Sequence, residues 1–250
     1  MRVALAGKGG VGKTTITATF ARLVARRGAR VVAIDADSNP NLAVALGVER
    51  ERAREAPFLP HQLVSRRFDG PALTEPIETV VNRYTLAAPD GVRVALMGMP
   101  THAGEGCLCA GHATVSAVLG DLGTLPDVVT VVDMEASPEH LSRGTTRHVD
   151  TLMLVTEPYY RSLETVRRLA QLAAELPIAR LAVIANKVRS EADAAAISEF
   201  CHHHGLQMAG QVPYSDSVVN ADLAGIPLLD STLDGGVIAA IGRLADSLLD

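Results

Sequence analysis

The stretch Gly7-Lys8-Gly9-Gly10-Val11-Gly12-Lys13-Thr14 decides the fold of this chain of 250 residues. It places two glycines, a lysine and a hydroxyl residue at the spacing of a P-loop, whose backbone N–H groups bind a chain of phosphates. A short apolar run, 3–6, precedes the loop, and a segment with helical periodicity, 15–27, follows it. The N-terminal end of such a helix attracts anions. The sequence therefore predicts a phosphate site between a strand and a helix.

Each residue type in this loop has a predicted task. Lys13 reaches the β- and γ-phosphates, and the hydroxyl of Thr14 ligates Mg²⁺. The glycines let the loop bend where a Cβ atom would clash. We expect ATP or ADP to be held by the backbone of Gly9, Gly10, Val11, Gly12, Lys13, Thr14 and Thr15.

Apolar strand-like runs alternate with helical segments along the rest of the chain, which predicts an α/β fold. The expected class is a P-loop NTPase: a mostly parallel twisted sheet with helices on both faces, in a single domain, 1–250. The predicted strands are Val3–Ala6, Val31–Ile34, Val92–Met97, Val128–Val132, Leu152–Val155 and Leu181–Ala185. The clearest helices are Thr15–Arg27, Ser162–Glu175 and Glu191–His204, with Gly28 and Gly205 as C-terminal stops. Residues 49–85 contain four prolines and predict an insertion of short helices and loops.

Composition limits the expected partners and compartment. Lysine and arginine together number 23 against 28 aspartate and glutamate residues, which gives a net charge of −5. Nucleic acid and anionic membranes are therefore not expected partners. No run approaches the roughly 18 apolar residues that a membrane span needs. Three cysteines are too few for a disulfide framework and indicate a reducing compartment, so we expect a cytoplasmic protein.

Lys8 adds a feature that ordinary P-loops lack. The string G-K-G-G-V-G-K-T-T, residues 7–15, resembles the deviant Walker A motif of the MinD/ParA/nitrogenase iron-protein class. The resemblance implies a homodimer with ATP between two protomers, in which Lys8 crosses the interface to the partner's nucleotide. For Lys8 considered alone, the alternative is a solvated loop lysine.

Three polar residues at strand ends complete the predicted nucleotide site. Asp37 follows the second strand, where the class carries switch I, and a carboxylate there can orient the attacking water; the alternative is an N-cap for a short helix, 41–46. Asp133 stands at the Walker B position and would support Mg²⁺ through water, or be a buried structural carboxylate. Asn186 closes a later strand, where the class uses asparagine to bind adenine, although such residues are often turn formers.

The pair Cys107-Leu108-Cys109 indicates which kind of ATPase this is. Residues two apart point about 200° apart on a helix, so the two thiolates face one way only in a turn or an extended segment. Two sulfurs are half of a tetrahedral S₄ metal site, and a two-fold dimer supplies the other half. Ni²⁺ or Zn²⁺ and ATP would then share one interface. The alternatives are two buried thiols or a redox-active pair.

The surroundings of this pair closely resemble the CooC family of nickel-insertion ATPases, which mature carbon monoxide dehydrogenase. The likeness is carried by 104–109, His112, 133–136 and 139–145 and extends over nearly the whole chain. It implies a homodimeric MinD-like ATPase that binds Ni²⁺ or Zn²⁺ and delivers nickel to an apo metalloenzyme such as carbon monoxide dehydrogenase. Ser137 departs from the family, which usually has glycine there, and a stiffer segment favours slow hydrolysis.

The sequence also indicates rival functions and contains a cluster of one cysteine and three histidines. A ParA/MinD-type scaffold is one rival, but the tail 233–250 carries one basic residue against three aspartates, which anionic lipid repels. An iron–sulfur carrier is another, since four cysteines across a dimer can hold a [4Fe–4S] cluster. A P-loop biosynthetic ligase is a third.

Residues 201–204, Cys-His-His-His, point in different directions on a helix, so a solvated face is expected there instead of a metal site.

Overall fold

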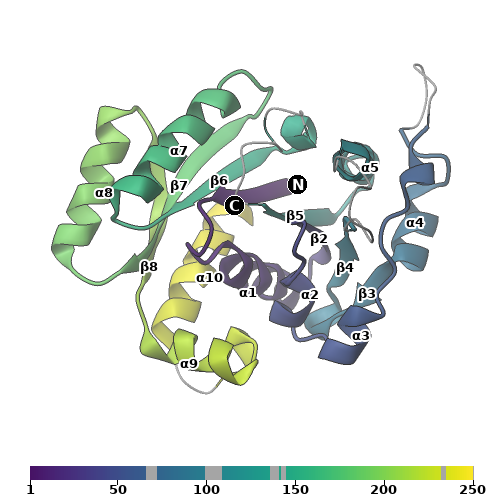
Figure 1. Ribbon diagram of the computed structural model, residues 1–250, viewed down its shortest axis with the longest axis horizontal. Coiled ribbons are helices and arrows are strands. Elements are labelled where there is room, and N and C mark those ends of the chain that lie inside the picture. Colours follow the sequence, from purple (N-terminus) through teal and green to yellow (C-terminus); the bar gives the residue numbers. More distant parts are fainter. Residues whose placement is uncertain (66–71, 99–108, 136–140, 142–144, 232–234, 250) are drawn as a thin grey trace, which may run out of the picture.

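Figure 1 shows the computed structural model, which describes residues 1–65, 72–98, 109–135, 141, 145–231 and 235–249. Within these ranges eight strands form one sheet in the order β3-β4-β2-β5-β1-β6-β7-β8. All neighbouring strands are parallel except β3 and β4, which are antiparallel. The strands are β1 (Arg2–Gly7), β2 (Arg30–Ala36), β3 (Thr85–Ala87), β4 (Arg93–Leu96), β5 (Val128–Met134), β6 (Thr151–Thr156), β7 (Arg180–Val188) and β8 (Gln207–Pro213).

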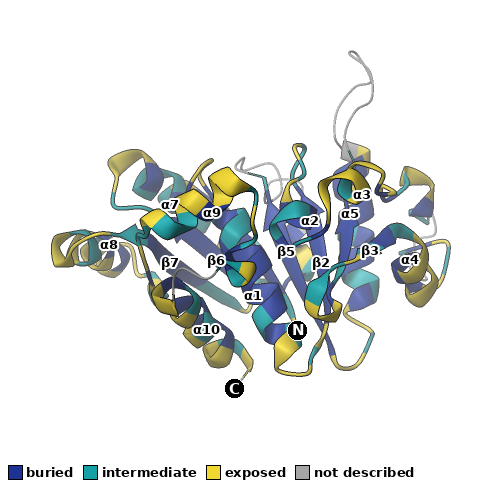
Figure 2. Ribbon diagram, turned by 90° about the horizontal axis from the view of Figure 1, so that it is seen from below, coloured by how far each residue is buried: buried dark blue, intermediate teal, exposed yellow. Residues whose placement is uncertain are grey.

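Helices cover both faces of the sheet, because its central strands are apolar on both sides. In β1, Val3 and Leu5 pack against one layer of helices, whereas Ala4 and Ala6 pack against the other. The first layer contains α1 (Lys13–Arg26), α2 (Leu42–Ala45) and α10 (Gly235–Leu249). The second contains α4 (Ile77–Tyr84), α5 (Cys109–Leu122), α7 (Tyr160–Ala173) and α8 (Glu191–His203). Figure 2 shows the buried strands between these layers.

Shorter elements connect the layers and the strands. Two further helices are α3 (Arg50–Arg54) and α9 (Asp216–Ala224), and the 3₁₀ turns are η1 (His61–Leu63), η2 (Pro89–Gly91), η3 (Thr145–His148) and η4 (Leu228–Asp230). None of the helices in the described ranges is long and apolar enough to cross a membrane.

The fold class predicted from the sequence is confirmed, and so are the six strands and three helices named above. Helices α1 and α8 both end two residues before their predicted glycine stops, and the insertion 49–85 contains α3, η1 and α4 as expected. The sequence analysis missed β3, β8, α5, α9 and α10. Strand β8 has no continuous apolar run, because it lies at the edge of the sheet and most of its residues are partly or fully exposed.

The buried guanidinium of Arg22 fastens α1 to two distant segments. Only 3% of this side chain is exposed. Its Nε donates to Asp90 at 2.6 Å, and its two terminal nitrogens donate to the two carboxylate oxygens of Asp230 at 2.7 Å each. Asp90 lies in η2, and Asp230 lies in η4, 208 residues after Arg22. The helix that begins at the predicted phosphate loop is thereby tied to the last part of the chain.

Arg22→Ala is expected to lower the free energy of unfolding by about 1.5–3 kcal/mol, because it removes a buried side chain and its hydrogen bonds to the charged Asp90 and Asp230. Arg26→Ala is the matched control. Arg26 also pairs with Asp90, but its side chain is 45% exposed, and an exposed pair contributes about 0–1 kcal/mol. Urea denaturation measures both variants. Equal losses of stability would contradict this role of Arg22.

Candidate functional site

The predicted P-loop connects the end of β1 to the start of α1, at the carboxyl edge of the sheet (Figure 1). Two of its glycines are required by close approaches of other backbone and side-chain atoms. At Gly7, where φ is +152°, a Cβ atom would lie 2.3 Å from the carbonyl oxygen of Val155. At Gly12, where φ is +92°, it would lie 2.6 Å from Nδ2 of Asn186. The loop is therefore pressed against β6 and β7 as it turns into α1.

The N-terminal end of α1 has the features of an anion site. Its N-cap, Gly12, supplies no side-chain acceptor, and the N–H groups of the first helical turn have no acceptor within the helix. These N–H groups and the helix dipole attract negative charge. The buried ammonium of Lys13 adds to this, donating to the Lys8 carbonyl oxygen at 3.4 Å. Burial lowers the pKa of Lys13 and nearby carboxylates raise it, so a phosphate beside this group would stabilise its charge.

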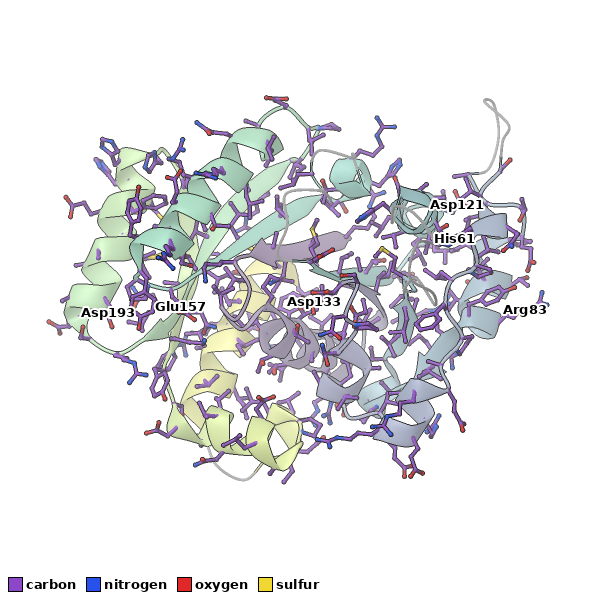
Figure 3. The ribbon with its side chains drawn as sticks, viewed as in Figure 1. His61, Arg83, Asp121, Asp133, Glu157 and Asp193 are labelled. Carbon is purple, nitrogen blue, oxygen red and sulfur yellow. The ribbon has the colours of Figure 1, made fainter. Side chains whose placement is uncertain are left out.

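Thr14 and Asp133 form the neighbouring polar pair. The hydroxyl of Thr14 donates to Oδ2 of Asp133 at 2.5 Å, from the first turn of α1 to the end of β5. Figure 3 shows Asp133 near the centre of the molecule, beside α1. Its other carboxylate oxygen, Oδ1, is buried and has no hydrogen-bond partner among the described residues. Burial raises the pKa of Asp133 to about 6, although Thr14 and Lys13 lower it.

This donor set fits a magnesium ion. Mg²⁺ prefers hard oxygen ligands and keeps several waters, and it binds through one or two carboxylates together with substrate phosphates. The hydroxyl of Thr14 and the carboxylate of Asp133 would hold the ion directly or through water. When bound, Mg²⁺ supplies positive charge that neutralises the phosphates.

Asp35 is a functional candidate that the sequence analysis missed. It lies opposite Asp133 in the parallel pairing of β2 with β5 and is fully buried. Burial and the neighbouring Asp133 raise the pKa of Asp35 to about 7, while backbone hydrogen bonds lower it. Asp37, Asn41 and Leu42 donate their backbone N–H groups to its carboxylate at 2.7–3.1 Å. Asp35 therefore holds the whole turn from Asp37 to the start of α2.

Asp37 itself lies in this turn and is half-buried. Its Oδ1 accepts the N–H of Asn39 at 2.8 Å. The alternative N-cap role for Asp37 is wrong, because the first N–H groups of the short helix are bound by Asp35 instead. Two apolar runs that both end in aspartate, at 35 and at 133, were the signal in the sequence that could have identified Asp35.

Asn186, at the end of β7, reaches the P-loop. Its Nδ2 donates to the carbonyl oxygen of Val11 at 2.6 Å, and the side chain is buried. Asn186 also lines a cavity of about 220 Å³ beside the loop, with Gly12, Pro213 and Tyr214 among the other lining residues. This cavity lies next to the start of α1.

A stacking contact between Arg189 and Tyr214 holds the Tyr214 ring in the wall of this cavity. The guanidinium of Arg189 lies 3.4 Å from the centre of the Tyr214 ring, and the Tyr214 hydroxyl donates to Asp216 at 2.8 Å. Both contacts fix the orientation of the ring.

The cysteine pair lies mostly outside the described residues. Cys107 and Ser137 are both outside them, and Cys109 is the first residue of α5. No group of three or more metal-binding side chains occurs among the described residues. The third cysteine, Cys201, is buried on α8, and the three histidines that follow it are exposed, as a solvated face requires.

In the absence of ligands, the free energy of unfolding of the wild-type protein is expected to fall, relative to that of the Asp133→Asn variant, as the pH rises. Burial raises the pKa of Asp133 to about 6, so the folded chain binds this proton more tightly than the unfolded chain does, where the pKa is about 3.9. The resulting stabilisation is complete below about pH 4 and is lost as the pH rises through 6, a difference on the order of 3 kcal/mol. Urea denaturation of both proteins between pH 4 and pH 8 measures it, and parallel pH profiles would contradict it.

Residues 3–228 match the family model described as the CobQ/CobB/MinD/ParA nucleotide binding domain. The carbon monoxide dehydrogenase accessory protein CooC of Rhodospirillum rubrum is 37% identical over 238 residues, which cover 92% of this chain and 90% of that protein. An iron-sulfur cluster carrier protein of Pyrococcus abyssi is 24% identical, covering 90% of this chain and 77% of the carrier.

Solved structures agree on the fold. The MinD cell division protein of Aquifex aeolicus superposes with a TM-score of 0.73 at 20% identity, covering 100% of this chain and 97% of that one. A strand, a glycine-rich turn, an uncapped helix and the Thr14–Asp133 pair lie within the matched domain. The chain therefore belongs to the CobQ/CobB/MinD/ParA family of nucleotide-binding proteins and is a CooC-type ATPase of that family.

Proposed function

We propose that this ATPase is a metallochaperone. It binds Ni²⁺ or Zn²⁺ at a C-x-C site shared by two chains and assists the insertion of nickel into carbon monoxide dehydrogenase or a similar metalloenzyme. The observation that carries the proposal is the 37% identity to the Rhodospirillum rubrum accessory protein over 92% of this chain. The pair Cys107 and Cys109 supports it, because thiolates are the preferred ligands of such metals.

The ATPase chemistry is assigned to the residues gathered at the start of α1. Lys13 and the backbone N–H groups of residues 9–15 bind the phosphates, and Thr14 and Asp133 hold the magnesium ion. Asp37, in the turn held by Asp35, orients the attacking water. Phosphoryl transfer needs such positioning and charge neutralisation more than covalent catalysis. Asn186 and the cavity beside it accept the adenine.

The metal and the nucleotide are proposed to share one homodimer interface. Helix α5 begins at Cys109, after the parallel strand β4, just as α1 begins after β1. Helices that follow parallel strands begin at the carboxyl edge of the sheet, which supports a common location for both sites. Lys8 is proposed to contact the partner's nucleotide, so that dimer formation would complete both sites together. We propose that the dimer works in the cytoplasm.

An iron–sulfur carrier is the second candidate function. The similarity to the carrier of Pyrococcus abyssi, over 90% of this chain, favours it specifically. Four cysteines across a dimer can hold a [4Fe–4S] cluster as well as a single metal ion. Colour separates the two functions, since a cluster is brown and Zn²⁺ is colourless.

Lys13→Ala is expected to abolish ATP binding, whereas Asp37→Ala is expected to retain binding and lose hydrolysis. Lys13 neutralises the phosphates already in the ground state, while Asp37 aligns water only for the transition state. Equilibrium binding of ATP and release of phosphate measure the two effects. Glu199→Ala, at an exposed position of α8, is the control that changes neither. An equal loss of ATP affinity in the Lys13 and Asp37 variants would refute the role of Asp37.

Metal titration tests the shared site. We expect one Ni²⁺ or Zn²⁺ per two chains, with binding lost in Cys107→Ala and in Cys109→Ala, because each chain supplies two of four sulfurs. Cys201→Ala is the matched control, since this buried cysteine lies on α8 and is expected to leave binding intact. One tightly bound metal per monomer would contradict the shared site and direct attention to His102 or His112 as local ligands.

A further inference from the structure

Lysine is rare in this chain and is concentrated in one place. Only 3 of the 250 residues are lysines, against 20 arginines, and they are Lys8, Lys13 and Lys187. Lys8 and Lys13 are part of the P-loop, and Lys187 contacts it from β7. A lysine ammonium is a compact point charge with three rotatable donors, whereas an arginine guanidinium is a wide planar fork. All three lysines therefore place a compact cation in the P-loop or in contact with it.

The backbone at Lys187 is in an unusual conformation. Its φ is +55°, in the left-handed region that few residues other than glycine adopt. The pairing of β7 with β8 also shifts register between Ala185 and Val188, so the ladder is irregular at this point. Consecutive side chains of a regular strand point to opposite faces. The irregularity lets Asn186 and Lys187 both reach the P-loop.

These two side chains bind two consecutive carbonyl groups of the loop. Asn186 donates to Val11, and Nζ of Lys187 donates to the carbonyl oxygen of Gly10, both at 2.6 Å. Nζ of Lys187 also forms an ion pair with Oε1 of Glu157 at 2.6 Å. Glu157 follows β6, and its backbone N–H donates to the hydroxyl of Ser162 at 3.1 Å. Figure 3 shows Glu157 close to the loop, at the end of α7 nearest to it.

We propose that Lys187 is a positioning residue for nucleotide binding. In a loop whose N–H groups converge on phosphate, the carbonyl groups point outward, where side chains of neighbouring strands can donate hydrogen bonds to them. Lys187 holds the Gly10 carbonyl in that outward orientation, and Glu157 holds the ammonium in place. The loop is thereby arranged before the nucleotide arrives. A left-handed backbone in a non-glycine residue costs free energy, and such strain is retained at sites where it positions other groups.

The kinetic consequence is specific. The P-loop contacts the phosphates of ATP similarly in the ground state and in the transition state. Loosening the loop therefore weakens the binding of both states equally, which raises KM and leaves kcat unchanged. Lys187→Met is expected to raise the KM for ATP by about 10-fold, the effect of losing one hydrogen bond to a charged group, and to leave kcat within about two-fold. Lys187→Asn tolerates the left-handed backbone but is too short to reach Gly10, so it should raise KM equally.

The experiment compares these variants with Arg180→Met, which removes a long cation from the opposite end of the same strand. Steady-state ATPase kinetics gives KM and kcat, and amide hydrogen exchange of the nucleotide-free protein reports opening of residues 7–12. We expect higher KM and faster exchange of the loop in both Lys187 variants and neither change in Arg180→Met.

Three outcomes would overturn the proposal. The first is a KM and a loop exchange rate in Lys187→Met that match Arg180→Met. The second is lower thermal stability with unchanged KM, which would make Lys187 a purely structural residue. A raised KM in Lys187→Met but not in Lys187→Asn would also overturn it, because the effect would then come from backbone strain. None of these outcomes alters the assignment of the chain as an ATPase.

Discussion

The turn between β1 and α1 imposes a constraint on everything around it, because N–H groups that converge on an anion force their carbonyl groups outward. Three of these carbonyl groups accept a hydrogen bond from a side chain. Val11 receives one from Asn186, Gly10 receives one from Lys187, and Lys8 receives one from Lys13. The end of β7 therefore supports the glycine-rich loop, although no residue of that strand belongs to the motif.

Charge at this edge of the sheet is arranged for a ligand that carries both signs. Asp35 and Asp133 are buried beside each other, and burial raises the pKa of each. Lys13 is buried nearby, and burial lowers its pKa. Each ionised form is costly without a counter-charge close by. A magnesium nucleotide supplies a cation for the carboxylates and an anion for the lysine, so the stability of this region is coupled to ligand binding.

Sequence reasoning located the motif and the fold well, for an identifiable reason. The P-loop works through backbone geometry and a fixed residue spacing, and the parallel strands are continuous apolar runs, so both leave a strong local pattern. Lys187 leaves none, and Asp35 leaves only the weaker signal of an apolar run that ends in aspartate. Asp35 acts through a turn that follows it, and Lys187 acts through a left-handed φ and a contact with Gly10, 177 residues away in the chain. Such roles depend on which strand ends meet, which spacing along the chain does not reveal.

The position of β1 at the centre of the sheet also determines when the molecule can form during synthesis. Its two neighbours are β5 and β6, and Val3 pairs with Val131 on one side and with Thr151 on the other. At a ribosomal rate of about 5–20 residues per second, about 6 to 25 s pass between the synthesis of β1 and that of β5. During this interval the apolar β1 has neither of its partners. The nascent chain therefore exposes an unpaired hydrophobic strand directly before its glycine-rich loop, and such unpaired strands are prone to intermolecular association until their partners are synthesised.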